Sequence, residues 1–334
     1  MKVGVVGPSE EDDFAWHIAR GLRRLGCEVT EFGPALGSTW AGSRRIGALR
    51  HIAFRDERIA QIGTRSIAGR IQESNVELVI TVESLPPGLV RQIAKMGVPS
   101  VLWFPDAVAN LGPLWMFKAS YAALFFKEPF LVRTLTDTYG YNAHYLPECC
   151  DPLVHRPIET AAIPSVAVVG NMYATRINLL CRLHSEGIPL TLYGGSSSEH
   201  LAGTPIEHLH TKRYLRGAEK ATVFRNSIAV LNNLHPAEIE GVNARLFEAT
   251  GSGGIVVTEF RAELPRLFSL DNEVLAFRNY AELVGLLKLL TSGEMDASGI
   301  ANAGSARSHA EHTYAQRLEV LLEIAWDSKV FRQR

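Results

Sequence analysis

Short apolar runs alternate with amphipathic stretches along most of the chain. This alternation is typical of parallel α/β units, in which a helix follows each buried strand and returns the chain to the same edge of the sheet. In the first half, the runs predict strands at Val3–Gly7, Glu28–Phe32, Leu78–Val82, Ser100–Phe104, Ala122–Phe126 and Ala143–Leu146. A Rossmann-like domain is therefore expected over residues 1–150.

The same pattern begins again after a proline-rich segment. Pro147, Pro152, Pro157 and Pro164 punctuate polar sequence, which predicts a linker over residues 151–164. Beyond it, strands are predicted at Val166–Gly170, Leu190–Tyr193, Ile228–Asn232, Ile255–Thr258 and Val274–Phe277, with helices at about 175–186, 213–226, 243–250, 280–291 and 309–327. The expected fold is α/β, with a second Rossmann-like domain over residues 165–308 facing the first across a cleft.

Composition excludes several classes of function. The chain has 334 residues, of which 34 are Lys or Arg and 35 are Asp or Glu, so no overall charge favours binding to nucleic acid. No apolar window is long enough to span a membrane, and the chain starts as a short strand instead of a signal peptide, which predicts a cytoplasmic protein. Cys27, Cys149, Cys150 and Cys181 show no metal-ligand spacing, so we expect reduced thiols and no metal site.

The stretch EGVNARLFEATGSGGIVV, residues 240–257, combines a loop, a helix and a strand. If Asn243 caps the helix, the free N–H groups of its first turn point toward Glu240 and Gly241, where an anion such as phosphate can bind. Glu248 lies five residues into the helix, roughly 7 to 8 Å from that phosphate position at 1.5 Å per residue. This is about the distance from a diphosphate to the ribose of the same nucleotide, so Glu248 is a candidate ribose ligand.

These residues carry a resemblance to a known family. The pair Glu240 and Glu248, with seven residues between them, resembles the E-x7-E motif of retaining GT-B glycosyltransferases of the family 4 type. The string from Asn243 to Ala249 is closer still to the CgeB-like branch of these enzymes. The resemblance implies a GT-B fold and a metal-independent, cofactor-free transferase of the hexosyltransferase type. Its donor would be a nucleotide-diphosphate sugar and its acceptor a small molecule, a glycan or a lipid-linked molecule.

The resemblance also implies which residues hold the donor. Glu248 would bind the ribose, Glu240 would act as the catalytic contact to the transferred sugar, and no protein base is needed for front-face attack. The remaining donor-binding candidates are Gly170, Asn171, Arg176, Gly194, Gly241, Val242 and Asn243, with Lys212, Arg213 or Arg245 as second cation because the lysine of the family pattern is missing after Arg176. The last helix, in residues 309–334, would pack back toward the first domain.

Acceptor-side candidates follow strands of the first half. Gly7 and Ser9 come directly after the first strand, where Ser9 can equally cap a helix over Glu11–Leu25. Trp103 and Asp106 lie at the end of the fourth strand. Asp106 would orient an acceptor hydroxyl as a second catalytic candidate, or it caps a helix, and Trp103 would offer an apolar face to a sugar ring.

An arginine-rich helical stretch is predicted over Ser43–Ser74. The segment from Arg44 to Arg70 contains seven arginines but only two acidic residues. The favoured interpretation is a solvated outer face, and the alternative is a peripheral contact with anionic lipid or with an acidic acceptor.

Three alternatives remain open at this stage. The two glutamates can be helix-stabilising and solvated residues without a function. A GT-B-like epimerase acting on UDP-sugars would need a carboxylate acid/base set that the sequence does not reveal. Two α/β lobes can also bind a nucleotide or a sugar without any chemistry.

Overall fold

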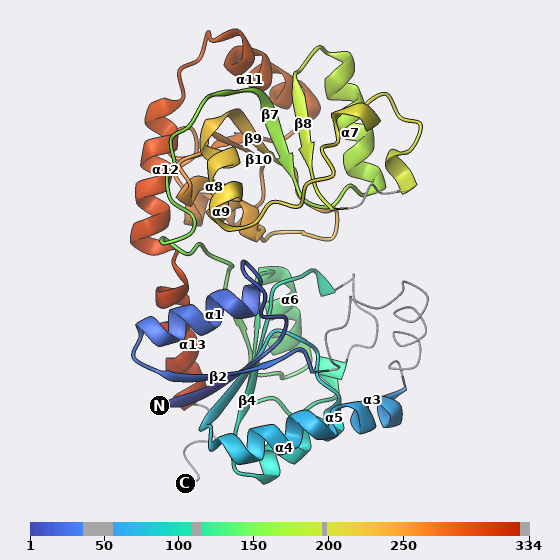
Figure 1. Ribbon diagram of the computed structural model, residues 1–334, viewed down its shortest axis with the longest axis vertical. Helices are drawn as coiled ribbons and strands as arrows, with labels where there is room; N and C mark the ends of the chain where they lie inside the picture. The colour runs from blue at the N-terminus through green and yellow to red at the C-terminus, as the bar shows by residue number, and fades with distance from the viewer. Residues whose placement is uncertain (36–55, 109–114, 196–198, 328–334) are drawn as a thin grey trace. The chain divides into compact units, whose positions relative to one another are not determined.

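The computed structural model describes residues 1–35, 56–108, 115–195 and 199–327 (Figure 1). Contacts within the chain divide it into two units: unit 1 contains Met1–Pro147 together with Tyr314–Arg334, and unit 2 contains Glu148–Thr313. The last helix therefore belongs to the same unit as the N-terminal half of the chain. The domain limits predicted above remain predictions.

Unit 1 is built on a six-stranded parallel sheet in the order β2-β1-β3-β4-β5-β6. Its strands are β1 (Lys2–Val6), β2 (Glu28–Gly33), β3 (Leu78–Thr81), β4 (Ser100–Phe104), β5 (Ala123–Phe126) and β6 (Ala143–Tyr145), and its helices are α1 (Phe14–Arg24), α3 (Glu57–Gly63), α4 (Arg65–Ser74), α5 (Pro87–Lys95), α6 (Pro129–Arg133) and α13 (Tyr314–Asp327). The buried residues of α4 and α5 form one cluster with Val6 and Val79 of the sheet. Apolar burial of this kind contributes about 25 cal/mol per Å² to folding.

Helices α1 and α13 pack closely because α1 has a glycine at the contact. A Cβ at Gly21 would lie 2.6 Å from Cδ1 of Leu318 and 3.1 Å from Cβ of Tyr314. A side chain at this position would therefore force Leu318 or Tyr314 to shift.

Unit 2 is built on a five-stranded parallel sheet in the order β11-β10-β9-β7-β8. Its strands are β7 (Ile163–Val169), β8 (Leu190–Tyr193), β9 (Ser227–Asn232), β10 (Val256–Glu259) and β11 (Leu275–Phe277), and its helices are α7 (Ala174–Ser185), α8 (Gly217–Asn226), α9 (Ala244–Gly251), α10 (Leu264–Leu267), α11 (Tyr280–Ser292) and α12 (Ser298–Glu311). Because β8 and β9 lie on opposite sides of β7, the chain reverses direction across the sheet at β7. Open α/β sheets bind their ligands beyond the carboxyl ends of the strands at such a point.

Every predicted strand overlaps an observed one, but three predicted helices need correction. The helix expected over Glu11–Leu25 starts at Phe14 with Asp13 at its cap position, so Ser9 does not cap it. The helix expected from residue 213 starts at Gly217, because Arg216 still has an extended backbone. The expected last helix, 309–327, is two helices, because the chain between α12 and α13 is held to another segment. There, the N–H of Cys150 donates to the carbonyl oxygen of His312 at 2.9 Å.

Other predictions are only partly covered by the described residues. None of the four cysteines forms a disulfide. Across the described ranges, no helix is both long and apolar enough to cross a bilayer. Of the predicted arginine-rich stretch, residues 43–55 lie outside the described chain, and α3 and α4 cover most of the rest. Arg70 of α4 donates to the carbonyl oxygen of Phe32 at 2.8 Å. A membrane contact there stays a prediction.

Candidate functional site: an arginine pair at the strand ends of unit 2

Arg176 lies in the first turn of α7 and reaches back to the ends of two strands. Its side chain is only 3% exposed. Its guanidinium donates to the side-chain oxygen of Asn233 at 2.9 Å, to the carbonyl oxygen of Asn233 at 3.0 Å and to the carbonyl oxygen of Asn171 at 2.9 Å. Three hydrogen bonds therefore fix the position of Arg176 between the ends of β7 and β9.

Arg245 approaches the same point from the first turn of α9. It donates to Oδ1 of Asn232 at 3.1 Å. A Cβ at Gly170 would overlap Nη2 of Arg245 and would lie 3.4 Å from Nη1 of Arg176. Gly170 also has a φ of +117°, a backbone conformation that favours glycine. The two guanidinium groups therefore meet over the bare backbone of Gly170.

The arginine pair carries an excess of positive charge. Burial, and then the neighbouring charge of Arg245, lower the pKa of Arg176 to about 10. Burial likewise lowers the pKa of Arg245, and the nearby carboxylates of Glu248 and Glu238 partly oppose that shift. Both groups remain cationic at neutral pH, although each is taken out of water beside a like charge. An anion bound at Gly170 would relieve this repulsion.

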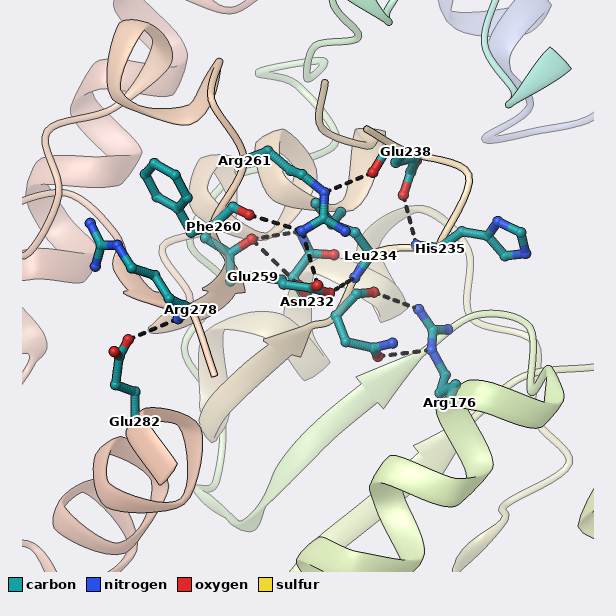
Figure 2. A network of polar contacts seen from close by, with 12 residues as sticks. Arg176, Asn232, Leu234, His235, Glu238, Glu259, Phe260, Arg261, Arg278 and Glu282 are labelled. Carbon is teal, nitrogen blue, oxygen red and sulfur yellow. Dashed lines mark hydrogen bonds and ion pairs between the residues drawn. The ribbon is translucent and has the colours of Figure 1, made fainter. Parts of the chain in front are cut away.

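Glu238 is the buried acidic residue of the loop that follows β9. Its carboxylate accepts from the N–H of His235 at 2.9 Å, and its carbonyl oxygen accepts from Arg261 at 2.7 Å (Figure 2). Its negative charge raises the pKa of both Arg176 and Arg245. Glu238 thus holds the loop in place and offsets part of the charge of the arginine pair.

Glu248 forms an ion pair on the inner side of α9. Its Oε1 lies 2.8 Å from Nζ of Lys220 in α8 and 3.8 Å from Nε2 of His155. The side chains of Glu248 and Lys220 are 16% and 9% exposed. The Lys220 ammonium group therefore orients the Glu248 carboxylate. A carboxylate that accepts hydrogen bonds from ligand hydroxyl groups has to be held in a fixed orientation in this way.

The loop before α9 differs from its predicted geometry at Asn243. Asn243 occupies the cap position, but its side chain makes no capping hydrogen bond, and its Oδ1 is buried without a partner among the described residues. Asn243 therefore stands at the cap position, as supposed, but does not cap the helix through a side-chain hydrogen bond. Val242 is fully buried, Gly241 is buried, and Glu240 is half-buried, with its carbonyl oxygen accepting from Glu263 at 3.1 Å.

The other donor-side candidates lie near the end of β8. A Cβ at Gly194 would lie 2.8 Å from the carbonyl oxygen of Gly170, so the two glycines are neighbours. Lys212 and Arg213 are exposed, and Arg213 pairs with Glu219. Of the three candidate second cations, Arg245 is the one whose guanidinium shares the Gly170 position with Arg176.

The acceptor-side candidates lie in unit 1. Gly7 is buried at the end of β1, Ser9 lies in the loop before α1, and Asp106 is exposed after β4, where it accepts from its neighbour Ala107 at 2.7 Å. Trp103 is fully buried, with ring centroids 4.8 Å from Phe14 and 6.1 Å from Tyr314. The prediction that Trp103 offers a face to a sugar is wrong, because its ring is part of the core of unit 1.

Sequence reasoning missed several polar residues around these strand ends. They are Lys220, Asn232, Asn233, Glu238 and, in unit 1, the Glu83 carboxyl beyond β3. One signal was available, since two successive asparagines close the apolar run of β9 at the edge where open α/β sheets bind ligands. The partners of Lys220 and Glu238 depend on how the helices pack, which periodicity does not reveal.

Comparison with known proteins places this geometry in a fold family. Residues 176–323 match the family model described as glycosyl transferase-like. Among curated proteins, no sequence matches the chain. Among solved structures, the chain is similar to a sucrose-phosphate synthase from Thermosynechococcus elongatus, with a TM-score of 0.69, 12% identity and coverage of 97% of this chain and 98% of that one. A glycosyltransferase from Rickettsia africae gives a TM-score of 0.67, 12% identity and coverage of 100% and 99%.

A third similar structure contains a ligand. Anabaena HepE, solved in complex with UDP-glucose, gives a TM-score of 0.66, 12% identity and coverage of 97% of this chain and 98% of that one. At this identity the likeness shows the fold alone, which is GT-B, as the sequence predicts. The family match over residues 176–323 supports a glycosyltransferase of the GT-B type and does not favour the epimerase. The CgeB-like branch stays a prediction.

Proposed function

We propose that this protein is a retaining, metal-independent glycosyltransferase of the hexosyltransferase type that takes its sugar from a nucleotide-diphosphate donor. The observation that carries the proposal is the pair of guanidinium groups that meet over Gly170, with Arg176 buried and Arg245 half-buried. As a glycosidic bond to a diphosphate breaks, negative charge grows on the leaving group. Fixed cations placed in advance stabilise that charge most strongly in the transition state.

The pair suits a diphosphate better than a monophosphate. Arg176 is held by hydrogen bonds to Asn233 and Asn171, while Arg245 is held by Asn232. Two cations anchored separately can each meet a phosphoryl group, and guanidinium groups bind phosphate oxygens through two parallel hydrogen bonds. This arrangement supplies the charge that a bound metal would otherwise supply.

The two glutamates receive different roles in this proposal. Glu248, oriented by Lys220 at 2.8 Å, accepts from the ribose hydroxyls of the nucleotide. Glu240 contacts the transferred sugar, where a carboxylate is favourable as positive charge builds at the anomeric carbon. The acceptor, which is a small molecule, a glycan or a lipid-linked molecule, would bind unit 1, with Asp106 as the exposed carboxylate of that side.

Uracil is the first base to test, because HepE structures contain UDP and UDP-glucose. A thermal-shift screen with UDP, GDP, dTDP and ADP, each paired with its monophosphate, tests the donor class. A ligand at 100 times its Kd adds about 2.7 kcal/mol to the free energy of unfolding. We expect one diphosphate to raise the Tm clearly more than its monophosphate. Equal shifts for both, or none for any diphosphate, would contradict the proposal.

The reaction itself is tested with the preferred donor alone. A transferase releases free sugar and nucleoside diphosphate slowly, because water replaces the acceptor. An epimerase releases an epimerised sugar, and a protein that only binds leaves the donor intact. NMR of the anomeric proton in a transferred product then distinguishes retention from inversion.

A further inference from the structure

A buried histidine borders the glycines of the arginine site from the side of β8. His210 follows the short 3-10 helix Glu207–Leu209 and pairs with Leu192 of β8 through an isolated bridge. Its side chain is 8% exposed. Its Nε2 lies 3.3 Å from the point where a Cβ at Gly194 would stand, and that point is 2.8 Å from the carbonyl oxygen of Gly170. His210 thus presents Nε2 to the two neighbouring glycines at the strand ends.

The second ring nitrogen of His210 has an unusual environment. Nδ1 is buried and has no hydrogen-bond partner among the described residues. Leaving a buried polar atom unpaired costs roughly 1 to 3 kcal/mol, so such atoms are few and call for an explanation. The backbone of this segment is held elsewhere, because the N–H of Thr211 donates to the carbonyl oxygen of Leu192 at 2.9 Å. The ring is therefore positioned by packing, with Nε2 as its usable hydrogen-bonding atom.

We propose that His210 is a third nitrogen ligand of the donor diphosphate, donating a hydrogen bond from Nε2 across Gly194 while Arg176 and Arg245 bind from the side of Gly170. This inference rests on the proposed function and extends it to a residue that neither the family pattern nor the fold assigns. It makes the diphosphate site three-sided, with ligands from α7, from α9 and from the segment after β8.

The charge state of His210 follows from its neighbours. Burial, and then the positive charge of Lys212, lower the pKa of His210. Protonation would also bury an unpaired Nδ1–H. His210 is therefore neutral at neutral pH, and the neutral ring donates through Nε2 while Nδ1 stays unprotonated.

Two substitutions separate the ring nitrogens. The amide nitrogen of glutamine lies close to where Nε2 of histidine lies, whereas the amide of asparagine lies near Nδ1. His210→Gln should therefore bind UDP within about threefold of the wild type. His210→Asn should lose about 10- to 150-fold, the range for one hydrogen bond to a charged group. His208→Asn, an exposed histidine two residues earlier, is the matched control and should bind like the wild type.

Calorimetric titration with UDP, UMP and uridine decides the outcome. The expected result is a loss for His210→Asn with UDP that shrinks for UMP and vanishes for uridine. An equal loss with uridine would place His210 at the nucleoside and overturn the proposal, as would a His210→Asn variant that binds UDP normally. A loss in His210→Gln as large as in His210→Asn would show a packing role and also overturn it. If the wild type binds no nucleoside diphosphate at all, it is the proposed function that fails.

A pH series checks the neutral form of His210. The ratio of the Kd of His210→Asn to that of the wild type should stay constant between about pH 7 and 8.5, because in this proposal the ring donates there as a neutral imidazole and takes up no proton on binding. Protonation of UDP affects both proteins and cancels in the ratio. A ratio that rises steeply as the pH falls through 7 would show a cationic His210 and overturn the assignment of a neutral donor.

Discussion

Nζ of Lys220 lies 2.8 Å from Oε1 of Glu248, and both side chains are largely buried between α8 and α9. Removing one partner of a buried ion pair leaves the other charge uncompensated and typically costs roughly 3 to 5 kcal/mol. Any test of Glu248 as a ribose ligand must therefore separate lost binding from lost stability.

We expect Glu248→Gln to keep the fold and to raise the Kd for UDP by about 10- to 150-fold, because a neutral amide replaces the charged acceptor of the ribose hydroxyls. Calorimetric titration with UDP measures this change. Lys220→Met is the companion variant: it removes the cation that orients Glu248 but no proposed ligand, so it should lose less affinity than Glu248→Gln. If Glu248→Gln bound UDP like the wild type at equal stability, the ribose role of Glu248 would be refuted.

The arginine pair gives a second prediction. Arg176→Ala and Arg245→Ala should each weaken UDP binding by about 10- to 150-fold and should weaken UMP binding far less, because each removes a charged donor to the diphosphate. Arg213→Ala is the control, because Arg213 is exposed and pairs with Glu219. Equal losses for UDP and UMP would move the diphosphate away from Gly170.

Periodicity and turn chemistry were enough to predict the strands, because parallel strands are buried on both faces and stand out as apolar runs. The glycine stop after α9 was also predictable, since Gly253 takes a φ of +74° directly after the helix. The break between α12 and α13 was not, because the hydrogen bond that holds it joins His312 to Cys150, far away in the sequence.

The site was predictable only in part. Arg176 stood out because it follows a strand end and a glycine, as the family pattern has it. Arg245 was one of three equal candidates, because spacing along the chain does not show which side chain reaches Gly170. Trp103 was misassigned for a related reason. The sequence does not show that Tyr314, from the far end of the chain, packs beside its ring, so a tryptophan at a strand end was interpreted as exposed.

Glu240 should affect turnover instead of nucleotide affinity. Glu240→Gln is expected to bind UDP within about twofold of the wild type and to lower kcat on the order of 10²-fold, as for the loss of one electrostatic contact in the transition state. Donor hydrolysis rates and calorimetry on the same preparation measure both quantities. A Kd for UDP that rises as much as kcat falls would contradict the assignment.

Glu83 gives a prediction about pH and stability. Burial raises the pKa of its carboxyl above the ordinary value of 4.5, although a hydrogen bond from the N–H of Ala35 partly opposes this. The folded state therefore binds the proton more tightly than the unfolded state, so this group lowers the free energy of unfolding as the pH rises from about 4.5 through the folded pKa.

Glu83→Gln removes that penalty while keeping an oxygen for the N–H of Ala35. The variant should be more stable than the wild type at pH 7, and the gain should vanish near pH 4, where the wild-type carboxyl is protonated in both states. Urea unfolding at the two pH values measures the difference. A gain that is the same at both pH values would show that the ionisation of Glu83 is not its cause.

The contact between α1 and α13 is tested by two glycine substitutions. Gly21→Ala places a methyl group 2.6 Å from Leu318 and should lower the free energy of unfolding by about 1 to 3 kcal/mol. Gly69→Ala in α4 is the matched control, since nothing lies within 4 Å of its new Cβ, and it should stabilise the protein by about 0.5 to 1 kcal/mol. Equal effects would mean that α13 does not pack on α1.

That packing also sets an order of events during synthesis. Unit 1 takes residues from both ends of the chain, so its last helix leaves the ribosome only after all of unit 2 has been made. At about 5 to 20 residues per second, the delay is roughly ten to thirty seconds. Over that time the surface of α1 around Gly21 lacks its partner, and the first unit is completed only when Tyr314 and Leu318 have been made.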